Sequence, residues 1–338
     1  MPRNSMPNGW EPPAPAWQSV WRDTADPLVA AYFAIQAEQP TLLHNWAVRA
    51  FAGAHPPAAL EQAMFVDQRG VSNYLYIGYW RHSEYRKWWA GEGNGEWWAD
   101  ARRPADGVGY WREIVVMPFD RFETLHSTQA PHGIGVTADS LAGPIREHGY
   151  PGGARDRIPL SDSDSLKNID SVATPLPAKV SAAGARVLLA PPENICVIRS
   201  GQNWSYCPDE EKAHYLEKVH PVLLQGMHFL RDNPLETNCY SMRFFDKKNS
   251  DWSATEQSFG LGYTTDIYAL ENWAKSHPTH LAIFGSFMQM VKTFGEQMQL
   301  RLWHEVTVLP ADKCEFEYIG CHRNTGLLSY IRENSSME

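Results

Sequence analysis

Two stretches of the chain repeat the same series of motifs, and this repetition limits the folds that the chain can adopt. Residues 78–118 begin with Gly-Tyr, continue through a short helical stretch that ends in tryptophan, and close with WREIVVMP. Residues 262–310 follow the same order and close with WHEVTVLP. The Gly-Tyr pairs lie 184 residues apart (262 − 78) and the closing segments 192 apart (303 − 111). The repetition predicts an α+β chain of two duplicated halves, each with antiparallel strands and with helices on one face.

The composition along the chain predicts where the two halves begin and end. Residues 1–25 include a proline-rich stretch and are expected to form an extended arm on the surface. Residues 26–136 contain the first copy of the repeat, and residues 186–330 contain the second. Residues 137–185 are rich in glycine, proline and polar side chains, so we expect a loop-rich connector between the halves.

Three segments give local predictions of secondary structure. Residues 47–65 are expected to be helical, with an interruption at a pair of prolines. Residues 91–109 are expected to form a glycine-rich loop. A long helix is predicted over residues 209–231, and Pro221 should kink or split it, because proline lacks the N–H and clashes with the preceding turn.

The segment SHPTHLAIF at residues 276–284 predicts the start of a helix with an apolar face. Pro278 suits the first helical position, since its missing N–H would be unpaired there anyway. Apolar residues recur from Leu281 at the spacing of one helix face. His280 lies in the first turn beside this face, where one ring nitrogen can enter an apolar pocket as an axial haem ligand does. The alternative interpretation is a core histidine that hydrogen-bonds a carbonyl group.

Further polar residues are candidates for a site. His304 lies on the closing strand of the second copy, and the two-residue period of a strand places it opposite the face of Trp303 and Glu305. A neutral imidazole there can act as a general acid or base. Ser200 ends an apolar strand without a G-x-S-x-G motif, so its hydroxyl suits hydrogen bonding to a ligand better than nucleophilic attack. The arginines of residues 155–157 can supply a fixed positive charge. The alternatives are an exposed strand histidine, a turn serine and a surface ion pair.

The composition disfavours several classes of protein. The net charge is −9 and the pI about 5.8, which disfavours a partner such as nucleic acid. No apolar run approaches the ~20 residues of a membrane span. Five cysteines without a CxxC pair indicate reduced thiols and a cytoplasmic protein. Fourteen tryptophans indicate either an aromatic core or a cavity for a large flat apolar ligand.

Six segments together resemble the aldoxime dehydratases, which are haem-containing lyases that convert aliphatic aldoximes or phenylacetaldoxime, R–CH=N–OH, into nitriles and water. The resemblance extends in the same order from about residue 28 to residue 328. The segments are REHGYPGGARDR (146–157), NICVIRSGQNW (194–204), CYSMRF (239–244), SHPTHLAIF (276–284), LRLWHEV (300–306) and CHRNTG (321–326).

The resemblance implies a role for four residues. His280 matches the axial ligand of the iron of haem b, which is ferrous in the active state. Ser200 matches a distal serine that hydrogen-bonds the oxime oxygen, and His304 matches a distal acid–base histidine. Arg157, in the connector, matches a distal arginine that supports catalysis. The family likeness also implies two ferredoxin-like halves, a haem between the sheet and a helix of the C-terminal half, a small aldoxime substrate, and a homodimer.

Other functions remain compatible with these motifs. In a haem peroxidase of ferredoxin-like fold, Arg157 and His304 would serve O–O cleavage of a peroxide. A non-catalytic haem carrier or sensor would need His280 but not the combination of Ser200 and His304. A module that binds a small ligand without haem would need none of the four residues as assigned.

Overall fold

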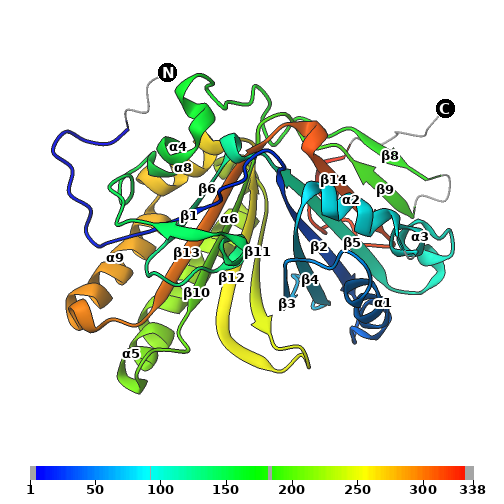
Figure 1. Ribbon diagram of the computed structural model, residues 1–338, viewed down its shortest axis with the longest axis horizontal. Helices are drawn as coiled ribbons and strands as arrows, with labels where there is room; N and C mark the ends of the chain where they lie inside the picture. Colours follow the sequence, from blue (N-terminus) through cyan, green and yellow to red (C-terminus); the bar gives the residue numbers. More distant parts are fainter. Residues whose placement is uncertain (1–4, 92, 182–184, 332–338) are drawn as a thin grey trace.

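A large antiparallel sheet dominates the computed structural model, which describes residues 5–91, 93–181 and 185–331 (Figure 1). The strands are β1 (Gln18–Val20), β2 (Leu28–Gln36), β3 (Ala59–Val66), β4 (Ser72–Arg81), β5 (Gly109–Met117), β6 (Phe122–His126), β7 (Ser140–Ala142), β8 (Ala178–Val180), β9 (Arg186–Leu189), β10 (Ile195–Asn203), β11 (Cys239–Lys248), β12 (Ala254–Thr264), β13 (Arg301–Leu309) and β14 (Cys314–Ile319). Twelve of them form one sheet in the order β6-β13-β10-β12-β11-β3-β4-β2-β5-β14-β9-β8, and β1 pairs with β7.

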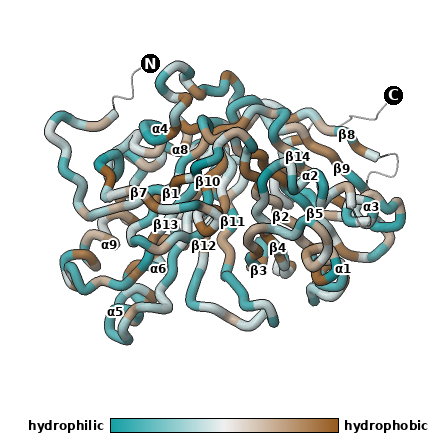
Figure 2. The backbone as a smooth tube through the Cα atoms, viewed as in Figure 1, coloured by the Kyte–Doolittle hydropathy of each residue, from teal (hydrophilic) through white to brown (hydrophobic). Residues whose placement is uncertain are grey.

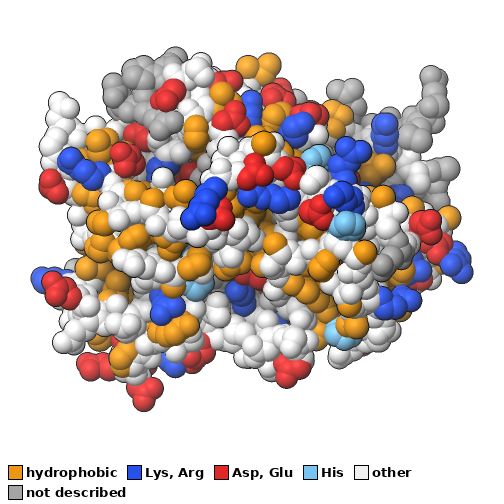
Figure 3. Space-filling model, in the orientation of Figure 1, with side chains coloured by type: hydrophobic (Ala, Val, Ile, Leu, Met, Phe, Trp, Pro, Cys, Tyr) orange, Lys and Arg blue, Asp and Glu red, His pale blue; other side chains and the backbone are white. Residues whose placement is uncertain are grey.

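Helices surround this sheet. They are α1 (Thr41–Ala52), α2 (His82–Ala90), α3 (Asn94–Ala99), α4 (Gly153–Arg157), α5 (Asp209–His214), α6 (His220–Asp232), α7 (Pro234–Thr237), α8 (Ile267–Ser276) and α9 (Pro278–Phe294). Within the described part of the chain, none of them combines the length and apolar character needed to cross a membrane. On the face shown in Figure 3, positive and negative side chains are interspersed.

Two groups of four strands within the sheet have the same arrangement. The N-terminal unit, residues 28–117, alternates as strand, helical segment, strand, strand, helical segment, strand, and places its strands in the order β3-β4-β2-β5. The C-terminal unit, residues 195–309, has the same series and the order β11-β12-β10-β13. The strand after each unit crosses to the other unit, because β6 pairs with β13 and β14 pairs with β5. The predicted α+β class with a large antiparallel sheet is therefore confirmed.

The inner faces of the two units pack against each other, and helices cover the outer faces (Figure 1). The shared core joins Tyr32 and Trp111 of the N-terminal unit to Tyr263 and Trp303 of the C-terminal unit. Helices α1, α2 and α3 cover the outer face of the N-terminal unit, while α6, α8 and α9 lie over the C-terminal unit. Figure 2 shows the hydrophilic tip at α5, far from the central strands that carry hydrophobic segments.

Two local predictions are wrong. Residues 47–65 do not form one interrupted helix, because α1 ends at Ala52 and the chain then forms β3. The reason is tertiary: β3 gains backbone partners on both sides, from β4 along its length and from β11 near its centre. Residues 91–109 are not only loop, since they contain α3, whose Trp98 is buried in an aromatic cluster with α1 and α2.

Two other predictions have a more detailed outcome. The helix predicted over 209–231 is interrupted, but by a π-helical turn at Tyr215–Val219 just before Pro221. Pro221 then lies in the first turn of α6, where no N–H is needed. The predicted arm is irregular from Ser5 to β1, and residues 1–4 lie outside the described residues.

A buried carboxylate connects the two units through the shared core. Glu113 of β5 accepts hydrogen bonds from the Arg243 guanidinium of β11 at 2.5 and 3.1 Å. The Tyr263 and Tyr318 hydroxyls donate to the same carboxylate at 2.7 and 2.8 Å. Glu113 is fully buried, and a buried charge is costly unless it is paired. Arg243 balances the charge of Glu113, and the hydrogen bonds satisfy its oxygens.

We predict that Glu113→Ala destabilises the protein strongly. The substitution leaves the buried Arg243 without its counter-charge, which is expected to lower the free energy of unfolding by about 3–5 kcal/mol. The measurement is urea unfolding followed by tryptophan fluorescence. The control is Asp312→Ala, which removes an exposed partner of Lys313 and should change stability by less than about 1 kcal/mol. Equal effects of the two substitutions would contradict the bridging role of Glu113.

Candidate active site

Ser200 and His304 are direct neighbours on the outer face of the C-terminal unit. In the antiparallel pairing of β10 with β13, Ser200 lies opposite His304, and on its other side it lies opposite Gly260 of β12. Side chains alternate along a strand, so His304 points outward while Trp303 and Glu305 are buried on the inner side, as predicted. The strands therefore hold the Ser200 hydroxyl and the His304 imidazole side by side, and Gly260 next to them has no side chain.

His280 lies in the first turn of α9, on the opposite wall. Pro278 takes the first helical position, and the His277 side chain caps the helix by accepting a hydrogen bond from the Thr279 N–H. The other ring nitrogen of His277 lies 3.2 Å from the Glu236 carboxylate. Both nitrogens of His277 therefore have partners at the helix end, whereas His280 lines the cavity between the helices and the sheet.

The His280 ring is suited to hold a ligand in this cavity. It packs edge-on against Trp273, with 4.7 Å between the ring centroids. Its Nδ1 atom is buried and has no well-aligned hydrogen bond among the described residues, although the Ala274 backbone interacts with the ring. Burial lowers the pKa of His280 below its usual range, so the imidazole is neutral near pH 7. A neutral imidazole is the form of histidine that binds a metal ion.

A cavity of about 270 Å³ separates His280 from the Ser200–His304 pair. On the helix side its walls are mostly apolar and come from α6, α8 and α9: Leu223, Leu230, Ile267, Leu270, Trp273 and Ile283, with Glu271 of α8 as a charged exception that pairs with Arg155. A haem site requires a mostly apolar pocket, an imidazole that can bind the iron, and a few polar groups on the other side. This cavity offers all three. The residues of this cavity therefore fit a haem group.

Arg157 and a residue that the sequence analysis missed, Glu123, join His304 beside the cavity. The Arg157 Nη2 atom lies 2.9 Å from His304 Nε2, and Arg157 Nε donates to Glu123 Oε2 at 2.7 Å. Glu123 Oε1 lies 3.1 Å from the same His304 nitrogen. A neutral His304 can accept the Arg157 N–H, whereas a protonated His304 can donate to Glu123. The cluster therefore has a stable arrangement for each protonation state of the histidine.

The Glu123 carboxylate keeps its charge despite being buried. Burial alone would raise its pKa, but Arg157 and His304 more than offset this effect, so the pKa lies below its usual range. A sequence signal for Glu123 exists in the repeat: Glu123 follows Arg112 by eleven residues, as Glu315 follows His304. The pairing is crossed between the copies, however, because His304 contacts Glu123 while Arg112 contacts Glu315 at 3.1 Å.

The loop that carries Arg157 is held by the N-terminal arm. The buried Asp156 carboxylate accepts hydrogen bonds from the Ser5 backbone N–H at 3.1 Å and from the Tyr150 hydroxyl at 3.0 Å. The Trp10 indole N–H donates to the His148 carbonyl at 2.9 Å. These contacts fix the loop that lines one end of the cavity.

The equivalent space in the N-terminal unit is filled with side chains. By strand pairing, Phe33 takes the position that Ser200 has in the C-terminal unit, with Arg112 opposite it on one side and Tyr76 on the other. The Phe33 ring packs against a cluster of aromatic side chains: Trp46, Phe51, Trp88, Trp89 and Trp98. At the same positions the C-terminal unit has the small residues Ser200 and Gly260, which leave the space open.

Comparisons with known proteins agree with this geometry. A family model described as haem-containing dehydratase matches residues 31–327. An aliphatic aldoxime dehydratase of Rhodococcus globerulus is 35% identical over 331 residues, which cover 96% of this chain and 92% of that protein. A phenylacetaldoxime dehydratase of a Bacillus species is 32% identical over 341 residues, which cover 99% and 96%. A crystal structure of an aldoxime dehydratase in complex with butyraldoxime is 34% identical, with a TM-score of 0.89 and coverage of 97% of this chain and 92% of that chain.

We predict that Glu123→Gln lowers stability in a pH-dependent manner. Because the folded-state pKa of Glu123 is depressed, its contribution is complete above the unfolded-state value of about 4.3 and is lost as the pH falls through the folded-state pKa. The variant should lose about 3–5 kcal/mol at pH 7, since Arg157 keeps a buried charge without its counter-charge. Urea unfolding at pH 7, 5 and 4 measures this difference, which should shrink at the lowest pH.

The control for this experiment is Glu296→Gln, a substitution of an exposed carboxylate after α9. It should leave the stability and its pH dependence unchanged. If Glu123→Gln behaved like Glu296→Gln, the charge of Glu123 would have no part in holding Arg157 and His304.

Proposed function

The chain belongs to the family of haem-containing dehydratases, and we propose that it dehydrates aldoximes, R–CH=N–OH, to nitriles. The resemblance indicated by six segments of the sequence is confirmed by these relatives. The observation that carries the proposed function is the placement of His280 and the Ser200–His304 pair on opposite walls of one apolar cavity. One wall offers a metal ligand, and the other offers the groups that an oxime needs.

His280 is the proposed axial ligand of haem b, between the sheet and α9. When bound there, haem would supply a ferrous iron that can bind the oxime nitrogen and weaken the N–O bond. The neutral imidazole and the mostly apolar walls on the helix side support this placement. Leu223 of α6 and Leu270 of α8 exclude water from the cavity, which strengthens the electrostatic effects of its polar groups.

Ser200, His304 and Arg157 are proposed to act on the substrate. Ser200 hydrogen-bonds the oxime oxygen and orients it. Protonated His304 gives its proton to the hydroxyl group as the N–O bond breaks, and water leaves. The neutral imidazole then takes the proton from the substrate carbon, the C≡N bond is completed, and His304 is protonated again. Glu123 stabilises the imidazolium form, and Arg157 adds positive charge beside the departing oxygen.

We further infer that the two units are ferredoxin-like halves of a duplicated chain, within the predicted boundaries 26–136 and 186–330. The common strand order and the common register of Gly78 and Gly262 support the duplication. Haem is proposed to bind in the C-terminal half because Phe33 and the surrounding aromatic rings fill the corresponding space in the other half. The connector, residues 137–185, contributes Arg157 to the distal side.

A homodimer in the cytoplasm is also proposed. Leu281 and Phe284 on α9 are 50% and 44% exposed and give an apolar surface that a second copy can cover. The five cysteines are free thiols, as in a reducing compartment.

We predict that His280→Ala abolishes haem binding. Haem-supplemented expression followed by absorption spectroscopy of the purified protein should show no Soret band, because the axial nitrogen is lost. His277→Ala, the matched neighbour, should retain the band while losing the helix cap, worth about 1 kcal/mol, and the contact with Glu236. If haem were lost in His277→Ala but retained in His280→Ala, the assigned ligand would be wrong.

We predict that the distal substitutions separate haem binding from turnover. His304→Ala should keep the haem spectrum and lower nitrile formation by about 10²–10⁴-fold, the usual contribution of a positioned proton transfer. Ser200→Ala should weaken oxime binding by about 1–3 kcal/mol through the lost hydrogen bond. The assay is anaerobic conversion of butyraldoxime by dithionite-reduced enzyme, with gas chromatography of the nitrile. Full turnover by His304→Ala would remove this residue from the mechanism.

A further inference from the structure

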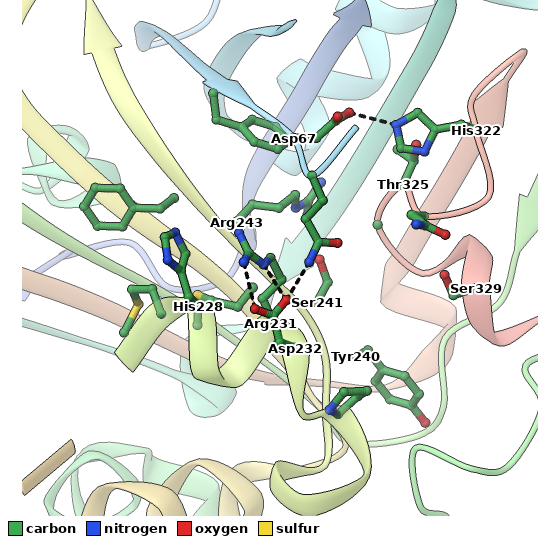
Figure 4. Close-up of a pocket in the computed structure, with 18 of the residues that line it drawn as sticks. Asp67, His228, Arg231, Asp232, Tyr240, Ser241, Arg243, His322, Thr325 and Ser329 are labelled. Atoms are coloured by element: carbon green, nitrogen blue, oxygen red, sulfur yellow. Dashed lines mark hydrogen bonds and ion pairs between the residues drawn. The ribbon is translucent and has the colours of Figure 1, made fainter. Parts of the chain in front are cut away.

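A second, larger cavity of about 500 Å³ lies between the two units (Figure 4). It forms where the sheet opens, because β11 pairs with β3 only through residues 246–248 and 62–64. Residues 65–68 of the N-terminal unit, residues 240–244 of β11, the end of α6 and several residues between 322 and 330 line this space. We call it the inter-unit cavity.

Two methionines separate the inter-unit cavity from the proposed haem cavity. Met227 of α6 and Met242 of β11 line both cavities, and no other described residue does so. Both side chains lie over Gly260, where an added Cβ would be 3.2 Å from the Met227 sulfur and 3.5 Å from the Met242 sulfur. Gly260 lies opposite Ser200 in the sheet, so the methionines are beside the distal hydroxyl.

The inter-unit cavity offers a polar environment whose charges are already balanced. Figure 4 shows His322 bonded to Asp67, at 2.7 Å, and Asp232 approached by neighbouring donors. Asp232 accepts hydrogen bonds from Gln68 at 2.5 Å and from Arg231 at 2.8 Å. Such a lining suits the passage of a small molecule with one polar group, because no unpaired charge is present in these pairs to trap it.

The opposite end of the haem cavity is covered by the N-terminal arm. Trp10 packs edge-on against Tyr150, with 5.7 Å between the ring centroids. Pro13 lies against Gly149 and Ser5 against Gly152, at distances that leave no room for a Cβ on either glycine. Entry at this end would require the arm to separate from the segment that holds Arg157. At the other end, the two cavities share only the flexible side chains of Met227 and Met242 among the described residues.

We propose that aldoximes reach the iron through the inter-unit cavity and that Met227 and Met242 form its gate, so that their size determines which substrates pass. Methionine suits a gate because its unbranched side chain has three rotatable bonds and adapts to a passing molecule. The glycines at 260 and 262 give both methionines space on the sheet side, since a Cβ at Gly262 would lie 2.5 Å from Met242 Cε. This inference rests on the proposed haem site and names the route into it.

The experiment measures access to the iron without turnover. Methyl and n-butyl isocyanide bind ferrous haem directly, and n-butyl isocyanide approximates the size of butyraldoxime. Stopped-flow absorption gives the association rate constants of the haem-loaded, reduced protein. Met227→Ala and Met242→Ala should each raise the rate constant for n-butyl isocyanide by about tenfold, which corresponds to about 1.4 kcal/mol in the barrier, with a smaller effect on methyl isocyanide. Met227→Phe, a bulkier side chain, should lower it.

The control is Met290→Ala, in a fully buried methionine of α9 that lines neither cavity. Its association rates should equal those of the unmodified protein, which separates a gate from a general loosening of the core. Unchanged rates in all three gate variants, or the same change in Met290→Ala, would overturn the proposed route. Size-dependent rates without nitrile formation would support the gate and refute the dehydratase function. Nitrile formation together with association rates that do not change in the gate variants would refute the gate and support the dehydratase function.

Discussion

The alternation of side chains along β10 and β13 is the constraint on which both the core and the site depend. Each strand presents one face to the core between the units and the other to the cavity. On β13, Trp303 fills the core above Gly201, where an added Cβ would lie 2.2 Å from the indole, and the next residue, His304, faces outward. A slip by one residue would bury the histidine and expose the tryptophan. Core packing therefore keeps His304 beside Ser200.

The two units use the same arrangement of strands for different purposes. In the N-terminal unit, Phe33 and Tyr76 join several tryptophans in a filled aromatic layer. In the C-terminal unit, Ser200 and Gly260 occupy the corresponding positions and leave a cavity. The high tryptophan content thus reflects mainly an aromatic core, although Trp273 lines the cavity beside His280. The aromatic layer of the N-terminal unit and the core between the units bury apolar side chains in close packing. The cavity of the C-terminal unit lacks such packing.

The distal polar groups are positioned by segments far apart in the chain. Glu123 comes from β6, Arg157 from α4 and His304 from β13. The carboxylate and the guanidinium are almost fully buried and bonded to each other, so neither group has freedom to reorient. Groups that are held before the substrate arrives stabilise developing charge without the cost of reorganisation. The arm contributes by bonding to Asp156, next to Arg157.

Local patterns in the sequence determined the repeat, the strand that carries His304, the face on which it lies, and the helix start at Pro278 that positions His280. These features depend on short-range sterics and periodicity, which neighbouring residues encode. Only the tertiary structure decided that residues 59–66 pair as a strand and that Glu123 joins His304. It also decided that two methionines divide two cavities. The reason is that β6 pairs with the C-terminal unit and β14 with the N-terminal unit. These pairings join residues about 180 to 210 positions apart, and the spacing within the repeat does not show which copy pairs with which.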